Sequence, residues 1–274
     1  MNNTKKISQR GIYILPALLT TGNMFCGFTA ITYIWAASLA RMTGDMTFTM
    51  ANLNRAAIAI GIAIVLDALD GRIARLMGAT SQFGVHLDSL ADAVSFGIAP
   101  ALLMWGWGLS DIKHFGWIAC FIFLICGVMR LARFNVQSGE LKHFVGLPIP
   151  AAAGIIAAFA HFAFKYKQLP LFSAPLFPYL LLGIGFLLGI SMVSTLRYIS
   201  FKSLTLRTGK SHFNIVLIAL FIAGVWFFSH EMLLILSVAY FLGGIAGTIR
   251  HKFWPRTNHP LPGEEEENAV ENAS

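Results

Sequence analysis

The sequence predicts an all-α integral membrane protein with about eight transmembrane helices. Of its 274 residues, 56% are hydrophobic and 12% are charged, against a charged fraction of about 25% in soluble proteins. The hydrophobic residues form runs close to the roughly 20 residues that a helix needs to cross a bilayer. These runs show no strand-like alternation with polar residues, and a helix satisfies its own backbone hydrogen bonds in lipid.

Eight apolar segments predict the spans. They cover residues 13–38, 55–77, 85–108, 115–134, 147–166, 174–196, 212–229 and 231–249. We expect a single transmembrane domain over residues 1–254. Residues 255–274 are rich in Pro and Glu, which predicts an acidic, disordered tail on the cytoplasmic side.

The basic residues predict the orientation. If both termini lie on one side of the membrane, 15 of the 20 Lys and Arg residues lie on that side. Cytoplasmic loops carry an excess of these residues, so we expect both termini to face the cytoplasm. The net charge of +7 is spread between apolar spans rather than gathered in one patch, so it does not indicate nucleic-acid binding.

Four of the six aspartates lie where the second predicted span ends and the third begins. Asp67 and Asp70 are three residues apart, Asp88 and Asp92 four, so each pair would share one face of a helix. A short turn at residues 78–83 would make the two helices antiparallel and point the pairs at each other. A carboxylate at the bilayer centre costs about 2.5–3.5 kcal/mol, so four of them need compensating positive charge.

Divalent cations can supply that charge. Carboxylate oxygens are hard ligands that select Mg²⁺, Mn²⁺ or Ca²⁺, and two ions about 3.5–4 Å apart can share bridging carboxylates. Gly71 and Gly84 would allow close approach to the backbone. A guanidinium such as that of Arg75 beside a metal site suits a phosphate. The alternative is a salt-bridged helix hairpin, but Arg72 and Arg75 cannot balance four acids.

The residues from Asp67 to Asp92 follow the pattern D-x2-D-G-x2-A-R-x8-G-x3-D-x3-D. This pattern resembles the signature of the CDP-alcohol phosphotransferase family at every fixed position, and the resemblance implies that family's fold. It implies that four aspartates bind two ions of Mg²⁺ or Mn²⁺, namely Asp67, Asp70, Asp88 and Asp92. It also implies that Asp92 is the general base, and that the CDP phosphates are held by Gly71, Arg75 and Ser81.

Four further segments resemble the phosphatidylserine synthase branch of that family, found in bacterial and archaeal membranes. They are residues 88–97, 130–135, 146–151 and 194–198. The resemblance implies transfer of the phosphatidyl group of CDP-diacylglycerol to L-serine, which gives phosphatidylserine and CMP. The distribution of basic residues puts the aspartates on the cytoplasmic side, and the resemblance implies the cytoplasmic membrane, with its lipids as partners, and a homodimer.

One face of the first span carries Thr20, Asn23 and Gly27, which are spaced for a helix. This face can be a seam of small residues for helix packing, or it can line the nucleotide pocket. The family resemblance favours the pocket for Asn23.

The carboxylate of serine needs a cationic partner when it leaves water. Four basic residues are expected at the membrane depth of the aspartates: Arg130, Arg133, Arg197 and Lys202. We favour Arg133 and Arg197, because each lies in the last turn of a span beside polar residues. The alternative is that these side chains anchor the helices to lipid headgroups.

Two other functions stay open at this point. The same chemistry could use another alcohol, such as glycerol 3-phosphate, inositol phosphate or choline. The aspartates could instead form the ion site of a divalent-cation transporter. That function accounts for the acids but not for Arg75, whose charge would oppose the passage of cations.

Overall fold

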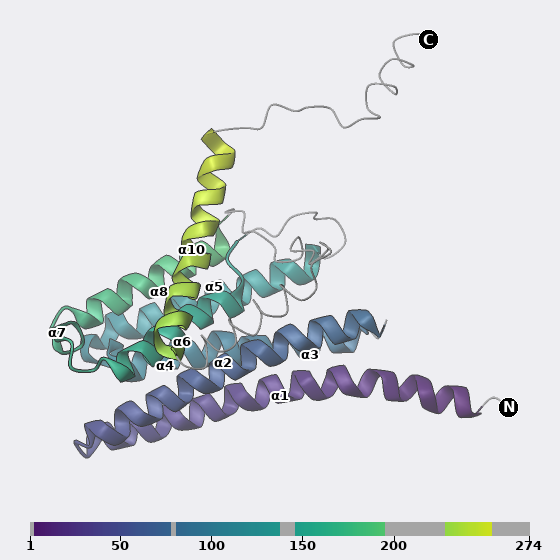
Figure 1. The fold of residues 1–274 in the computed structure, drawn as a ribbon, viewed down its shortest axis with the longest axis horizontal. Helices are drawn as coiled ribbons and strands as arrows, with labels where there is room; N and C mark the ends of the chain where they lie inside the picture. The colour runs from purple at the N-terminus through teal and green to yellow at the C-terminus, as the bar shows by residue number, and fades with distance from the viewer. Residues whose placement is uncertain (1–2, 78–80, 138–145, 195–227, 254–274) are drawn as a thin grey trace, which may run out of the picture.

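The computed structural model describes residues 3–77, 81–137, 146–194 and 228–253, and no strand occurs among them (Figure 1). Helices α1 (Asn3–Met42) and α2 (Met46–Leu76) form a long pair that lies side by side. The turn between them contains Gly44, whose φ of 81° favours glycine. The all-α prediction is confirmed.

The third predicted span is one helix in three parts. It consists of α3 (Gln82–Asp92), a π-helical turn η1 (Ala93–Ile98) and α4 (Ala99–Trp107). π-Helical turns are rare and occur often at functional sites. This one directly follows Asp92, and its own Ser95 donates a hydrogen bond of 2.9 Å to the backbone carbonyl of Asn23 in α1. The turn therefore lies against α1 beside the aspartates.

The next helices complete the bundle. A 3₁₀ turn, η2 (Leu109–Ile112), leads into α5 (Lys113–Gln137). Helix α6 (Ile149–Lys165) packs on α2, and α8 (Phe177–Val193) packs on α5, with the short α7 (Pro170–Ser173) between them. The N–H of Leu147 donates to the carbonyl of Ser191 at 3.0 Å, which ties the start of α6 to the end of α8.

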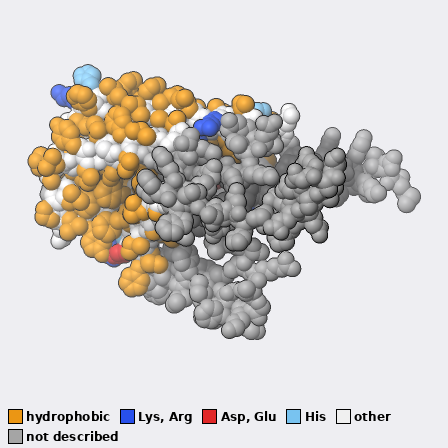
Figure 2. All heavy atoms as spheres, turned by 90° about the horizontal axis from the view of Figure 1, so that it is seen from above, with side chains coloured by type: hydrophobic (Ala, Val, Ile, Leu, Met, Phe, Trp, Pro, Cys, Tyr) orange, Lys and Arg blue, Asp and Glu red, His pale blue; other side chains and the backbone are white. Residues whose placement is uncertain are grey.

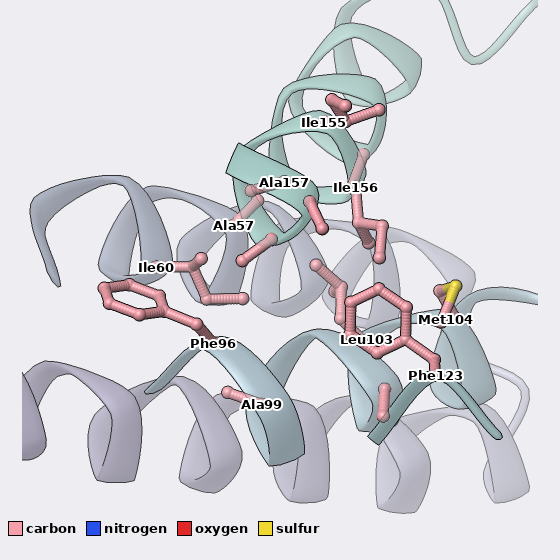
Figure 3. Close-up of a cluster of buried hydrophobic side chains, with 14 of the residues drawn as sticks. Ala57, Ile60, Phe96, Ala99, Leu103, Met104, Phe123, Ile155, Ile156 and Ala157 are labelled. Carbon is pink, nitrogen blue, oxygen red and sulfur yellow. The ribbon is translucent and has the colours of Figure 1, made fainter. Parts of the chain in front are cut away.

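Small and large apolar side chains interlock in the core (Figure 3). Phe96 from η1, Leu103 and Met104 from α4 and Phe123 from α5 are fully buried. Alanines from α2, α4 and α6 lie among them, and small residues let helices approach closely within a membrane. These are Ala57, Ala99 and Ala157.

Helix α10 (Ser229–Phe253) packs on α6 and is held there by polar contacts at its first turn. The imidazole of His161 lies 3.1 Å from the hydroxyl of Ser229, and His230 bonds to the carbonyl of His161 at 2.8 Å. Lys165 donates to Glu231 at 2.5 Å. These contacts fix α10 at the end of α6.

Several helices are suited to a membrane. Within the part of the chain that the structure describes, four stretches are long and apolar enough to cross one: Leu15–Met42, Gln82–Trp107, Leu109–Val136 and Ser229–Thr248. Two shorter apolar helices, α6 and α8, coincide with predicted spans, and α2 covers the predicted span 55–77. Hydrophobic side chains dominate the described part of the face in Figure 2. Residues 212–227 and the tail 255–274 lie outside the described residues, so the count of eight stays a prediction.

Close packing of α1 on η1 depends on Gly27. A Cβ at this position would lie 2.3 Å from Oγ and 2.7 Å from Cα of Ser95. We expect Gly27→Ala to lower the thermal midpoint of the protein purified in detergent, because overpacking typically costs about 1–3 kcal/mol. Gly61 in α2 is the matched control, since its added Cβ meets nothing within 4 Å. Equal midpoints for Gly27→Ala and Gly61→Ala would contradict this packing.

Candidate functional site

Three of the four motif aspartates meet in space. Asp67 from α2 and Asp88 and Asp92 from α3 each offer a carboxylate oxygen, and these oxygens lie within 4.8 Å of one another. Asp92 is buried, and the other two are half-buried. The spacing in the sequence therefore predicted a cluster that the structure contains.

Asp70 is also buried, but it lies outside this group of three. Its carboxylate forms a short hydrogen bond with the hydroxyl of Thr20 in α1. That hydroxyl is also 3.1 Å from the carbonyl of Pro16. Asp70 is thus fixed at the edge of the cluster, and its role as a metal ligand stays a prediction.

Asn23 connects α1 to the cluster. Its side chain is fully buried, and its Nδ2 donates to Oδ1 of Asp92 at 3.2 Å. Its Oδ1 has no hydrogen-bond partner among the residues that the structure describes. On this face of the first span, Gly27 packs on η1, whereas Thr20 and Asn23 form hydrogen bonds to aspartates; the nucleotide pocket stays a prediction.

The start of α3 is set by Ser81. Its backbone is extended, and its Oγ accepts a hydrogen bond of 3.0 Å from the N–H of Gly84. This is an N-cap, which satisfies one of the free N–H groups at the start of a helix. The cap fixes where α3 begins, and therefore the direction in which Asp88 and Asp92 point.

Arg130 is the described basic residue that lies beside the cluster. It comes from α5, is half-buried, and lies close enough to Asp92 and to Tyr240 of α10 for electrostatic interaction. Its Nε is buried and has no hydrogen-bond partner among the described residues. Arg133, which the sequence favoured, is exposed. Arg130 is thus half-buried near Asp92, whereas Arg133 is exposed.

The C-terminal end of α5 is hydrogen-bonded to α3. The Nδ2 of Asn135 donates to Oγ of Ser89 at 2.8 Å. Ser89 directly follows Asp88, so this bond holds α5, and with it Arg130, next to the aspartates. The segment 130–135 was predicted to lie at this depth, but its partner on α3 was not predicted.

The surroundings of the remaining predicted residues are described only in part. Gly71 is exposed on α2, directly after Asp70. The backbone of Arg75 belongs to α2, but its side chain is outside the description. Arg197 and Lys202 lie outside the described residues. Tyr240 was not predicted, since a single tyrosine in an apolar helix gives no signal.

The cluster suits a divalent cation. Two unit charges 4 Å apart interact with about 4 kcal/mol at an effective dielectric constant of 20, so adjacent carboxylates repel each other strongly. Among the described residues, no Lys, Arg or His forms an ion pair with Asp67, Asp88 or Asp92. Carboxylate oxygens and the unpartnered Asn23 oxygen are the donors that Mg²⁺ and Mn²⁺ prefer.

Comparison with known proteins agrees with this geometry. The chain is 34% identical over 239 residues to a protein of Helicobacter pylori (strain J99) named CDP-diacylglycerol–serine O-phosphatidyltransferase, covering 85% of this chain and 90% of the relative. A Bacillus subtilis (strain 168) protein of the same name is 34% identical over 138 residues, or 50% of this chain and 70% of the relative.

An archaeal protein is also similar. Archaetidylserine synthase of Methanothermobacter thermautotrophicus is 37% identical over 161 residues, which are 58% of this chain and 62% of the relative. The family model for CDP-alcohol phosphatidyltransferase matches residues 13–191, more than half of the chain and the whole aspartate motif. This chain therefore belongs to the CDP-alcohol phosphatidyltransferase family.

Proposed function

We propose that this protein transfers the phosphatidyl group of CDP-diacylglycerol to the hydroxyl of L-serine, releasing CMP. The observation that carries the proposal is the group of three carboxylates at Asp67, Asp88 and Asp92, built by the family motif. The names of the similar proteins support serine as the acceptor. CMP release measured with serine, glycerol 3-phosphate, inositol phosphate and choline in turn tests this choice, and serine should be the preferred acceptor.

The four motif aspartates are proposed to hold two ions of Mg²⁺ or Mn²⁺. When bound, the ions would act as Lewis acids that neutralise the negative charge developing on the departing CMP. Asp67, Asp88 and Asp92 already lie together, and Asp70 is the proposed fourth ligand.

The CDP phosphates are assigned to Gly71, Arg75 and Ser81, with Asn23 as a further contact to the bound nucleotide. Gly71 lies beside Asp70 and has no side chain to exclude a phosphate. The Ser81 oxygen accepts from Gly84, so its own hydrogen can be donated to a phosphate oxygen. Arg75 would supply a charge-assisted contact.

Asp92 is proposed as the general base. It would take the proton of the serine hydroxyl as the serine oxygen bonds to the phosphorus that carries the diacylglycerol. The bond from this phosphorus to the bridging pyrophosphate oxygen would break at the same time, and CMP would leave with the electron pair. Asn23 would orient the base, because it donates to Oδ1 of Asp92 and leaves Oδ2 to the substrate.

Arg130 is the proposed partner of the serine carboxylate. It lies beside the base, so a serine held by its carboxylate would present its hydroxyl to Asp92. Its Nε carries a proton that no described residue accepts. Arg133, Arg197 and Lys202 remain the other candidates.

Several wider features belong to the same proposal. Residues 1–254 would form a single catalytic domain in the cytoplasmic membrane, with both termini and the aspartates facing the cytoplasm. Residues 255–274 would form a cytoplasmic tail. The family resemblance also suggests a homodimer.

The first test concerns the metal. We expect Asp88→Asn to abolish CMP release and to weaken Mn²⁺ binding, measured by electron paramagnetic resonance on the purified protein. EDTA should abolish the activity of the wild type, and Mg²⁺ or Mn²⁺ should restore it. Asp45→Asn is the control, since Asp45 is exposed in the turn between α1 and α2. Full activity in excess EDTA would exclude metal-dependent transfer.

The second test separates binding from chemistry. Arg75→Ala should weaken the binding of CDP-diacylglycerol, because a hydrogen bond to a charged group is worth about 1.5–3 kcal/mol. Asp92→Asn should mainly lower kcat. Binding is measured by titration and turnover by CMP release. The phosphate role of Arg75 is wrong if nucleotide affinity is unchanged in its variant.

The third test compares two arginines on one helix. Arg130→Lys keeps the charge but loses the bidentate guanidinium, so we expect a raised KM for serine with unchanged nucleotide affinity. Arg133→Lys should change the KM for serine far less. Serinol, which lacks the carboxylate, should be a poor acceptor for the wild type and insensitive to Arg130→Lys. If the wild type uses serinol and serine with equal efficiency, no arginine recognises the serine carboxylate.

A further inference from the structure

A cavity lies far from the aspartates. It has a volume of about 450 Å³, within the range of small-molecule sites, and lies where the ends of α1, α2, α4, η2, α7 and α8 meet. Met50 of α2 lines it, and Asp67 lies about 26 Å further along the same helix at 1.5 Å per residue. The hydrocarbon core of a bilayer is about 30 Å thick, so the cavity belongs to the opposite side of the membrane.

Aromatic rings form one wall of this cavity. Trp107 is buried and stacks on Phe172 with a centroid distance of 6.3 Å. Its contact with Phe177 is edge-on at 5.2 Å. All three residues line the cavity. Such rings suit an alkyl chain, and their faces also attract an ammonium group.

An ion pair forms the polar part of the cavity. Nη2 of Arg41 donates to both oxygens of Asp111, at 2.7 and 2.9 Å. Nη1 of Arg41 lies 3.1 Å from Oγ of Ser110 and 3.3 Å from the carbonyl of Gly106. Arg41 is therefore largely engaged, whereas each Asp111 oxygen keeps a second acceptor site and its side chain is half exposed. A ligand that brings a positive charge fits this arrangement better than an anion.

The surroundings point to a ligand from the bilayer. Leu176 and Tyr179, at the start of α8, are 73% and 58% exposed, and Tyr179 lines the cavity. A tyrosine with one apolar and one polar end is typical of the membrane interface. The cavity thus combines an apolar wall with a carboxylate acceptor, next to exposed apolar side chains.

We propose that this cavity binds one zwitterionic phospholipid with an ammonium headgroup, from the leaflet opposite the aspartate cluster. The ammonium would lie between Asp111 and the aromatic wall. An acyl chain would lie along Trp107 and Phe177. The bound lipid would bridge the α1–α2 turn and the start of α8, which are far apart in the sequence.

The test uses the full chain, delipidated in a neutral detergent. Dioleoyl phosphatidylethanolamine and dioleoyl phosphatidylglycerol are added separately at equal concentration, and retained lipid is counted by native mass spectrometry. We expect one ethanolamine lipid per chain, bound about tenfold more tightly than the glycerol lipid, which corresponds to about 1.4 kcal/mol. Equal retention of the two lipids, or retention of neither, would overturn the proposal.

Two variants locate the lipid. Ala174→Trp would fill the cavity from its lining and should abolish retention, whereas Leu176→Trp adds the same ring to a nearby exposed position that does not line it. Asp111→Asn should lower the ratio of the two affinities, ethanolamine lipid over glycerol lipid, from about ten to close to one. If Ala174→Trp retains lipid as Leu176→Trp does, the lipid binds elsewhere. CMP release by Ala174→Trp is measured separately and reports on the aspartate site. Loss of transfer activity can therefore be distinguished from loss of lipid binding.

Discussion

The mutual repulsion of carboxylates within a membrane-embedded bundle is the constraint on which this structure depends. Asp67, Asp88 and Asp92 come from two helices and lie together, and among the described residues no Lys, Arg or His forms an ion pair with them. Such a group is stable only if donors and cations surround it. Helix α1 supplies donors to two motif aspartates, since the hydroxyl of Thr20 bonds to Asp70 and the amide of Asn23 bonds to Asp92. Hydrogen bonding to the aspartates thus accounts for Thr20 and Asn23 on the buried face of α1.

The sequence predicted the parts of this site that depend on local spacing. Asp88 and Asp92 share a helix face because they are four residues apart, and Asp67 from α2 lies with them. The fold class followed from the apolar runs for the same reason, since length and composition are local properties. The exception within the motif is Asp70, which lies with Thr20 rather than in the group of three.

Contacts between distant segments could not be predicted in this way. The sequence placed Arg130 and Arg133 at the same depth, and nothing local distinguishes them. What distinguishes them is the environment formed by other helices, in which Arg130 lies beside Asp92 and Tyr240 while Arg133 is exposed. The π-helical turn η1, which packs on Gly27 of α1, was not predicted either.

The π-helical turn has a consequence for how the chain tolerates insertions and deletions. Residues 93–98 separate the carboxylates of α3 from the core residues of α4 within one continuous helix. Removing one residue there would rotate one half against the other by about 100°, since an α-helix has 3.6 residues per turn. Either the aspartates would turn away from α1, or Leu103 would leave the core. The number of residues in this segment therefore sets the rotation of α3 relative to α4, whichever side chains the segment carries.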